Sequence, residues 1–278
     1  MNILMTGDAG FIGQNLAFYL VDCGHNVEGF DWKGPDVLPN PEKFDWVIHL
    51  GAISSTTETD VEKVLKQNYE FTMNLIQICD KFGVNMQIAS SASVYGPGLD
   101  GYKEDSKCLP QSPYAWSKYL IDRFLIEAGI YNKEFNMNIQ VFRYFNVYGP
   151  KEEHKGDQAS PVHKFTNQAK KDKVIKVFEN SENYVRDFIC VSDVCRVHEK
   201  MLSQDTSGIF NVGTGTTTSF QSVADTIANK FGATIETIPM PEKLKGQYQK
   251  YTCADLTNLN KHCKIEEYMT VKEYINAY

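Results

Sequence analysis

The first thirteen residues constrain the fold of this chain more than any other segment. They read MNILMTGDAGFIG, a short apolar run that leads into Gly7, Gly10 and Gly13. The amphipathic stretch 15–21 follows, and Asp31 stands at the end of the next strand-like run. A strand, a glycine turn and a helix place a pyrophosphate on the helix N-terminus, because glycines let the backbone come close to it. The segment therefore predicts a dinucleotide-binding site.

Strand and helix patterns alternate along the first half of the chain. Helical patterns cover residues 61–82 and Pro113–Glu127, and Ser112 is suited to cap the second helix. Short apolar runs with the length of buried strands lie at residues 2–5, 26–31, 45–50, 85–89 and 138–143. This alternation predicts an α/β fold, a Rossmann-like, doubly wound parallel sheet with helices on both faces.

The connection from Asp31 to Asp45 is too short for the helix and strand that a dinucleotide fold normally has there. Three prolines and one glycine make residues 32–44 a poor helix. We therefore expect a loop, a shortened sheet that lacks one strand and one helix after the second strand, and a more open adenine pocket.

The pattern changes after Pro150. A polar stretch precedes a helical pattern at Pro161–Lys171, strand-like runs at Val174–Phe178 and 188–191, and a helical pattern at Phe220–Phe231. We expect a smaller substrate-binding lobe interwoven with the sheet. The dinucleotide-binding domain is expected to comprise residues 1–150 and about 184–212, and the lobe about 151–183 and 213–278.

Composition narrows the class of protein. The chain has 278 residues, 42% of them apolar, and a formal net charge of −7. The apolar share is sufficient for a packed core, and the negative charge argues against a general nucleic-acid binder. No apolar run approaches the ~18 residues of a membrane span, and a strand follows the first residue where a signal peptide has a basic region. We expect a cytoplasmic protein with no membrane or nucleic-acid partner.

The seven cysteines form no close metal-binding pair, and most of them lie inside apolar segments. They predict buried thiols in a reducing compartment, with neither a disulfide nor a metal site.

A tyrosine and a lysine supply the candidate catalytic pair. Tyr114 and Lys118 are four residues apart on the predicted helix, so both side chains leave one face of it. An ammonium beside a phenol stabilises the phenolate and lowers its pKa from ~10, so that it can take a hydroxyl proton near neutral pH. Ser91, in SSASVYG at 90–96, follows the strand 85–89 at the edge of the sheet where ligands of open α/β folds bind.

Together, the glycine turn, the serine and the Tyr-x-x-x-Lys pair resemble the extended short-chain dehydrogenase/reductase group that modifies nucleotide sugars. By that resemblance Tyr114 is the acid/base, Lys118 binds the nicotinamide ribose and assists Tyr114, and Ser91 hydrogen-bonds the reacting oxygen. The resemblance and the glycine turn assign the nicotinamide cofactor to Gly7, Gly10, Phe11, Ile12, Gly13, Asp31, Trp32, Lys33, Leu50, Gly51, Ala52, Ser54, Asn68, Lys118 and Val147.

Motifs in the second half narrow the resemblance to the ADP-glycero-manno-heptose 6-epimerases of that group. They are FRYFNVYGP at 142–150, EHKG at 153–156, FENSEN at 178–183, RDF at 186–188, FNVGTG at 210–215 and KLKGQY at 243–248. An epimerase returns hydride to the opposite face of a carbon, so a proton donor is needed in each orientation of the keto intermediate. The resemblance gives this second role to Lys155.

The same resemblance places nucleotide-sugar contacts at Asn146, Asp157, Lys164, Phe178, Glu179, Asn180, Ser181, Arg186 and Tyr248. A guanidinium such as that of Arg186 suits a diphosphate. The chain departs from the family pattern at Asp157, where serine is usual, and at Lys164, where histidine is usual. The resemblance also implies a homo-oligomer. The helices 61–82 and Pro113–Glu127 are candidate interface faces, and their apolar residues fit an ordinary core equally well.

The cofactor is expected to be tightly bound, and the residues leave NAD and NADP open. Asp31 suits a ribose 2′-hydroxyl and disfavours a 2′-phosphate, which favours NAD. The heptose epimerases commonly hold NADP through a nearby lysine, here Lys33, and we favour NADP.

Dehydration is one competing function, and the residues argue against it. A 4,6-dehydratase needs an acid and a base directly after the active-site hydroxyl, where this chain has Ala92 and Ser93. Two alternatives stay open. A UDP-hexose 4-epimerase fits Ser91, Tyr114 and Lys118 and is discriminated only by the His-Lys-Gly setting of Lys155. A non-catalytic dinucleotide-binding protein fits the shortened sheet.

Overall fold

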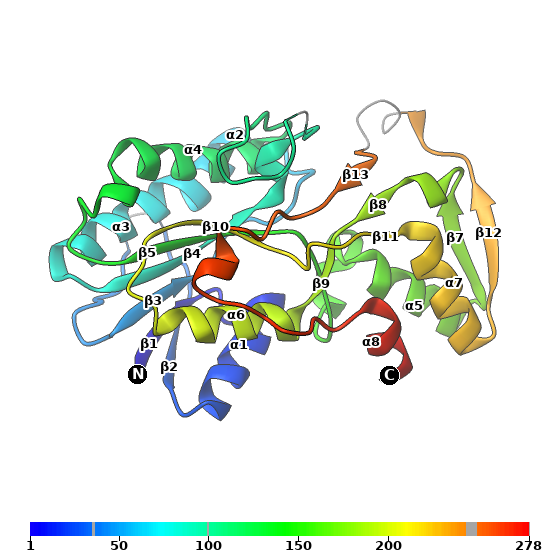
Figure 1. The fold of residues 1–278 in the computed structure, drawn as a ribbon, viewed down its shortest axis with the longest axis horizontal. Coiled ribbons are helices and arrows are strands. Elements are labelled where there is room, and N and C mark those ends of the chain that lie inside the picture. The colour runs from blue at the N-terminus through cyan, green and yellow to red at the C-terminus, as the bar shows by residue number, and fades with distance from the viewer. Residues whose placement is uncertain (35–36, 99, 243–248, 278) are drawn as a thin grey trace.

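A parallel sheet of six strands forms the larger part of the molecule (Figure 1). The computed structural model describes residues 1–34, 37–98, 100–242 and 249–277. The strand order across the sheet is β10-β5-β4-β3-β1-β2. The bounds are β1 (Asn2–Thr6), β2 (Asn26–Phe30), β3 (Trp46–His49), β4 (Asn85–Ser91), β5 (Ile139–Tyr144) and β10 (Gly208–Val212). The predicted Rossmann-like sheet is confirmed.

Helices cover both faces of this sheet. Figure 1 shows α1 (Phe11–Asp22) and α6 (Val191–Leu202) on one face, and α3 (Phe71–Phe82) and α4 (Pro113–Glu127) on the other. Every residue of β3, β5 and β10 is buried, as expected for strands packed on both sides. The sheet therefore exposes mainly its edges, and its carboxyl edge is free to bind ligands.

The sheet ends at β2, as the short connection predicted. β2 pairs with β1 in parallel, and the described part of residues 31–45 contains neither a helix nor a strand. A Rossmann sheet usually continues by one more strand at this point. The two residues after β2, Asp31 and Trp32, are exposed.

The predicted helix 61–82 is present as a continuous run with a wider central turn. It comprises α2 (Val61–Val64), the π-helical segment η1 (Leu65–Glu70) and α3. A single π turn inside a helix is often found at a functional site, because it redirects side chains. Here the buried side chain of Asn68 lies on that turn.

The smaller part of the molecule lies beyond the carboxyl edge of the sheet. β7 (Val174–Phe178) pairs in parallel with β12 (Thr234–Ile238), and α5 (Pro161–Lys171), α7 (Phe220–Phe231) and α8 (Val271–Ala277) pack beside them (Figure 1). Two further small sheets consist of β8 (Val185–Arg186), β11 (Thr218–Ser219) and β13 (Tyr251–Thr252), and of β6 (Asn146–Tyr148) and β9 (Phe188–Cys190). We call β7, β12, α5, α7 and α8 the lobe.

The segment near the C-terminus returns to the sheet before the chain ends. Leu259, Cys263 and Ile265 are buried in the same cluster as residues of β5, α6 and β10. The turn η7 (Leu259–Lys261) therefore packs against the sheet, and only α8 closes on the lobe.

Among the described residues, no helix is both long and apolar enough to cross a membrane. All seven cysteines are free thiols, and Cys79, Cys190, Cys195 and Cys263 are buried.

Candidate active site

A cleft of about 450 Å³ lies at the carboxyl edge of the sheet and has three walls. The glycine turn and the start of α1 form the first wall, α4 the second, and the short turn η4 (Glu153–Gln158) the third. The lining residues are Gly7, Gly10, Phe11, Ile12, Gly13, Leu50, Gly51, Ala52, Ile53, Ser54, Ser55, Ala89, Ser90, Tyr114, Lys118, Tyr144, His154, Lys155 and Gln158.

The glycine wall has the shape that a pyrophosphate requires. Gly7 has φ +73°, and a Cβ on it would lie 2.6 Å from the backbone nitrogen of Gly51. A Cβ on Gly13 would lie 2.1 Å from the carbonyl oxygen of Gly7, so only glycine lets α1 pack this close to β1. Gly10 caps α1 without a side-chain hydrogen bond, which leaves the first backbone N–H groups of the helix facing the cleft. The residues present therefore fit a dinucleotide.

Tyr114 and Lys118, on α4, both line the cleft, and Ser91, the last residue of β4, lies outside the lining and hydrogen-bonds with Tyr114. Ser112 caps the helix by accepting a hydrogen bond from the Ala115 N–H. The Lys118 side chain is buried, and its Nζ donates to the carbonyl oxygen of Ala89 over 2.8 Å. Burial lowers the pKa of Lys118 to about 8.

The pKa of Tyr114 differs from the expectation of a lowered value. Burial raises it, because a phenolate loses hydration in the cleft, and a hydrogen bond with Ser91 partly opposes that effect. The Lys118 ammonium is held by Ala89 and does not lower this pKa in the structure. The expected lowering of the Tyr114 pKa by Lys118 is therefore not found in this structure.

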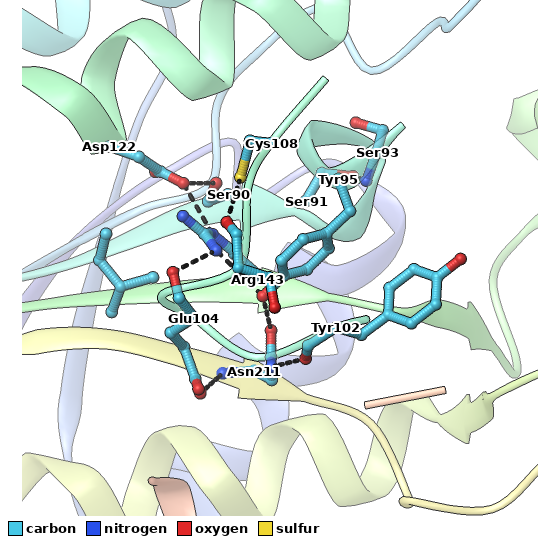
Figure 2. A network of polar contacts seen from close by, with 12 residues as sticks. Ser90, Ser91, Ser93, Tyr95, Tyr102, Glu104, Cys108, Asp122, Arg143 and Asn211 are labelled. Atoms are coloured by element: carbon cyan, nitrogen blue, oxygen red, sulfur yellow. Dashed lines mark hydrogen bonds and ion pairs between the residues drawn. The ribbon is translucent and has the colours of Figure 1, made fainter. Parts of the chain in front are cut away.

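A buried ion pair joins α4 to β5 (Figure 2). Arg143 Nε donates to Asp122 Oδ2 over 2.8 Å, and Ser90 Oγ donates to the same oxygen over 3.2 Å. Burial alone would lower the pKa of Arg143, but the charges of Asp122, Tyr95 and Cys108 and the hydrogen bond with Tyr95 together outweigh it and raise that pKa, so Arg143 stays charged. The negative charge of Asp122, one helical turn after Lys118, raises the pKa of Lys118 against the effect of burial. Asp122 thus helps Lys118 to keep its proton.

The third wall carries Lys155 into the same cleft. Its Nζ lies 5.3 Å from the centre of the Phe11 ring, and burial lowers its pKa while Glu152 raises it. Glu152 itself is buried and accepts hydrogen bonds from Gly149 N, Ser160 N and Ser160 Oγ. The carboxylate of Glu152 therefore closes the loop from which Lys155 projects.

Asn68 lies behind the cleft rather than on its lining. Its Oδ1 accepts from Ile53 N over 2.8 Å, and its Nδ2 donates to Ile53 O and to Ser117 Oγ. The amide therefore fixes the backbone of the 51–54 turn, whose residues line the cleft. Val147 likewise lies outside the lining and packs with Ile12 and Leu50.

The residues assigned to the adenosine end of the cofactor lie at the open edge of the sheet. Asp31, Trp32 and Lys33 all follow β2 directly, and all three are exposed. They lie outside the lining of the cleft, which ends at the glycine turn.

A second cavity, of about 310 Å³, lies in the lobe. It contains three of the predicted nucleotide-sugar residues, Lys164, Phe178 and Ser181. Its other lining residues are Pro161, Phe165, Gln168, Lys176, Val177, Tyr184, Phe220 and Ile238. Flat aromatic and aliphatic side chains with a few polar groups suit a nucleoside.

The two positions that depart from the family pattern contact each other. Lys164 Nζ donates to the backbone oxygen of Asp157 over 2.6 Å. Lys164 therefore joins η4, which carries Lys155, to the helix α5 that lines the lobe cavity.

The remaining described nucleotide-sugar candidates, Arg186, Glu179, Asn180 and Asn146, lie outside the linings of both cavities. Arg186 is buried with its guanidinium 5.4 Å from the centre of the ring of Phe220, which lines the lobe cavity. Glu179 N donates to Ile238 O, and Asn180 has a left-handed backbone with φ +60°. Asn146 N donates to Asp187 O. Tyr248 and the KLKGQY segment lie outside the described residues.

Sequence reasoning missed several lining residues of both cavities. Tyr144, His154 and Gln158 line the cleft, and Tyr184 and Phe220 line the lobe cavity. A signal existed for Tyr144 and His154, because each stands inside a motif already singled out, at 142–150 and 153–156. The lobe residues carried no signal, since an apolar side chain such as Phe220, the first residue of α7, is typical of any core.

Comparison with known proteins gives the same result as the geometry. Residues 3–213 match the family described as "NAD dependent epimerase/dehydratase family". The chain is 38% identical to an ADP-L-glycero-D-manno-heptose-6-epimerase of Brachyspira hyodysenteriae, over 99% of this chain and 96% of that protein.

Two solved structures show the same fold. An ADP-L-glycero-D-manno-heptose-6-epimerase of Helicobacter pylori superposes with a TM-score of 0.84 at 27% identity, covering 100% of this chain and 94% of that one. MoeE5 in complex with UDP-glucuronic acid and NAD superposes with a TM-score of 0.82 at 25% identity, covering 99% of this chain and 97% of that one. The resemblance predicted from the motifs is confirmed.

Proposed function

Because this chain belongs to the NAD dependent epimerase/dehydratase family, we propose that it is a nucleotide-sugar epimerase that inverts C6 of an ADP-glycero-manno-heptose. One observation carries the proposal. Lys155 faces the same cleft as Tyr114 and Lys118, from a different wall. Two separate proton-handling groups in one cleft suit a reaction in which the substrate oxygen takes two orientations and needs a proton donor or acceptor in each.

The glycine wall and Lys118 would hold a nicotinamide dinucleotide, which would supply the hydride acceptor and donor. The phenolate form of Tyr114, reached by loss of its own proton to solvent, removes the proton of the C6 hydroxyl as that carbon is oxidised to a ketone. Ser91 donates a hydrogen bond to the reacting oxygen, and Lys118 stabilises the phenolate. After the ketone turns over and the hydride returns to the other face of C6, the Lys155 ammonium protonates the resulting alkoxide. Tyr114 then holds the proton taken from the substrate and Lys155 lacks one, and exchange of both groups with solvent restores the starting state. No net oxidation remains, because the two steps are the reverse of each other at opposite faces.

We assign the nucleoside to the lobe cavity and the diphosphate to the buried Arg186. The division of the chain into a dinucleotide-binding domain, 1–150 and about 184–212, and a lobe, about 151–183 and 213–278, belongs to this proposal. A cytoplasmic location is part of it as well.

We propose NADP as the resident cofactor. Lys33 is exposed two residues after Asp31, beyond the last strand of the sheet, where its ammonium is available to a 2′-phosphate. Denaturing the purified protein and identifying the released nucleotide by mass spectrometry tests this assignment. Release of NAD alone contradicts it.

We propose that the protein forms a homo-oligomer through α4. Trp116, Leu120 and Phe124 are exposed at successive helical turns, and Val61 is exposed at the start of the neighbouring α2. An apolar stripe on two adjacent helices suits contact with the same stripe of a second copy. Light scattering of the Phe124→Glu variant is expected to show a smaller particle than the original chain.

The decisive test of the activity is incubation with each C6 epimer of ADP-glycero-manno-heptose in parallel with UDP-glucose. Proton NMR is expected to show that each heptose epimer converts to the same mixture, while UDP-glucose stays unchanged. Interconversion of UDP-glucose and UDP-galactose alone would establish the 4-epimerase alternative. Tight nucleotide binding without conversion of any nucleotide sugar would establish a non-catalytic dinucleotide-binding protein.

A further inference from the structure

Four buried polar side chains form a chain of hydrogen bonds beneath the cleft, and the mechanism above uses none of them. Gln87 on β4 and Gln140 on β5 are register partners in the sheet, and both are fully buried. His198, on α6, is fully buried as well, and Tyr144 ends the chain at the lining of the cleft. Buried amides and an imidazole are costly unless each is hydrogen-bonded, so their arrangement calls for a function.

Backbone carbonyls, which can only accept, determine which atoms in this chain of hydrogen bonds are donors and which are acceptors. Gln140 Nε2 lies 3.0, 3.3 and 3.4 Å from the carbonyl oxygens of Met201, Gln204 and Thr206. The Gln140 amide nitrogen must therefore face them, and its Oε1 accepts from Gln87 Nε2 over 2.9 Å. Gln87 Nε2 also donates to the carbonyl oxygen of His198, over 3.1 Å. Both amide orientations are thus fixed by their surroundings.

This orientation selects one tautomer of His198. Gln87 Oε1, an acceptor, lies 2.6 Å from His198 Nδ1, so Nδ1 carries the proton. Burial lowers the pKa of His198 to about 3, so the imidazole is neutral and its Nε2 holds a lone pair. The Tyr144 hydroxyl, 2.6 Å away, donates its proton to that lone pair.

The consequence for the cleft is that Tyr144 has no proton left to give. Its oxygen presents lone pairs alone, and burial raises the pKa of Tyr144 well above its ordinary value, so the phenol stays intact. Tyr144 is also the register partner of Ser91 on the adjacent strand, which places it next to the catalytic group. Of the two phenols in the cleft, Tyr114 is thus the one available as an acid, and Tyr144 is an acceptor.

We propose that Tyr144 is a positioning residue that accepts a hydrogen bond from a neutral donor of the ligand bound beside Ser91, and that His198 sets this direction. The inference rests on the proposed function only in taking the cleft as the site of cofactor and sugar. Two donors have the required chemistry, the carboxamide NH2 of a nicotinamide and a hydroxyl of the sugar.

The experiment uses Tyr144→Phe in the intact protein and measures two quantities. The first is the rate at which bound dinucleotide exchanges with labelled dinucleotide in solution, and the second is KM for the nucleotide sugar. Loss of the acceptor is expected to raise one of them about tenfold. Faster exchange assigns the donor to the nicotinamide and a raised KM assigns it to the sugar, while no change in either overturns the proposal. Exchange is measurable even if no sugar is converted, so this test stands apart from that of the activity.

Tyr148→Phe is the matched control for Tyr144→Phe. It separates the proposed positioning of the ligand by Tyr144 from the loss of stability that follows when any buried hydroxyl is removed. Tyr148 is fully buried and donates to the carbonyl oxygen of Met269, and it lies outside the lining of the cleft. Tyr148→Phe is therefore expected to lower the melting temperature as Tyr144→Phe does, with exchange and KM unchanged. Equal effects of both variants on exchange or KM overturn the proposal.

The role of His198 is tested by a double-mutant cycle. His198→Leu removes the acceptor of the Tyr144 proton, so the hydroxyl is free to turn toward the cleft, and binding is expected to weaken. If His198 acts through Tyr144, the double variant binds no more weakly than Tyr144→Phe alone. Additive losses in the double variant show a separate structural role of His198 and overturn the relay.

Discussion

The two walls of the cleft that carry the proposed proton-handling groups are built in different ways. Tyr114 and Lys118 stand on α4, a helix of 15 residues that packs along one face of the sheet. Lys155 stands on η4, a turn of six residues interrupted at Gly156, whose φ is +50°. The helix is held by many side chains at once, whereas the turn depends on the carboxylate of Glu152.

The construction of each wall predicts how well it tolerates substitution. A helix distributes its stability over its length, so the loss of one contact moves its side chains little. A short loop closed by one buried carboxylate concentrates its stability in a few hydrogen bonds. We therefore expect substitutions of the buried residues that hold η4, which carries Lys155, to lower kcat more than substitutions of similar size at residues that support α4, which carries Tyr114.

The largest effect is expected from removing either proton-handling group. Tyr114→Phe and Lys155→Met should each lower kcat by about 100- to 10,000-fold, because general acid–base catalysis contributes that range. In a single turnover each variant should still oxidise one C6 epimer, since the opposite wall is intact. Nicotinamide absorbance measures this, and loss of the same epimer by both variants contradicts the division of labour between the walls.

Glu152→Gln tests whether the η4 wall depends on the Glu152 carboxylate. A glutamine offers one acceptor where Glu152 accepts three hydrogen bonds, so we expect a loss of about 1–3 kcal/mol in unfolding free energy and about tenfold in kcat. Urea denaturation and steady-state rates measure the two effects.

Asp193→Asn is the matched control for Glu152→Gln. Asp193 is also a buried carboxylate, which accepts from Met269 N and pairs with Arg196, remote from the cleft lining. This variant should lose stability with kcat unchanged. A similar fall of kcat in both variants would show that Glu152 has no special connection to Lys155.

A smaller effect on kcat is expected from removing the negative charge of Asp122, which lies on α4. The pKa of Lys118 is about 8, so the fraction of charged Lys118, and kcat with it, should fall as pH rises through about 8. Asp122→Asn removes the negative charge that raises this pKa, so the fall in kcat should move to lower pH. The profile of kcat against pH measures the shift.

Ser90→Ala is the control for Asp122→Asn, because it removes a hydrogen bond to the same carboxylate without removing the charge. It should leave the pH of the fall nearly unchanged. Equal shifts in the two variants would show that hydrogen bonding, and not charge, sets the ionisation of Lys118.

The smallest effect on activity is expected at the cap of α4. Ser112→Ala removes the hydrogen bond to the Ala115 N–H and should cost about 0.5–2 kcal/mol of stability. Because α4 is held along its length by the sheet, kcat should stay within about twofold of the original. A large loss of kcat would show that α4 is as dependent on single contacts as η4 is.

Local patterns in the sequence were sufficient for the elements that carry the site. The bounds of α4, α5 and α7 agree with the predicted ranges, because caps such as Ser112 and Ser219 and stops such as Gly232 act within one turn. The short sheet followed from residues 32–44 for the same reason, since prolines limit the local backbone.

Interactions between distant residues were beyond such reasoning. The lobe cavity exists because β7 pairs with β12, and the Tyr144–His198 contact joins residues 54 positions apart. The raised pKa of Tyr114 depends on how much of the ring the fold buries, which no spacing reveals. Sequence motifs therefore identified the chemical groups, and the fold decides their protonation.

The end of the sheet at β2 also has a consequence for engineering. The outer side of β2 meets no other strand among the described residues, and Glu28 and Lys43 form an exposed ion pair beside it. Charged side chains on a terminal strand discourage intermolecular pairing and so protect against aggregation. At the same time, residues 31–45 offer a natural insertion point, at which a grafted strand–helix unit would extend the scaffold without crossing either of the walls that carry Tyr114 and Lys155.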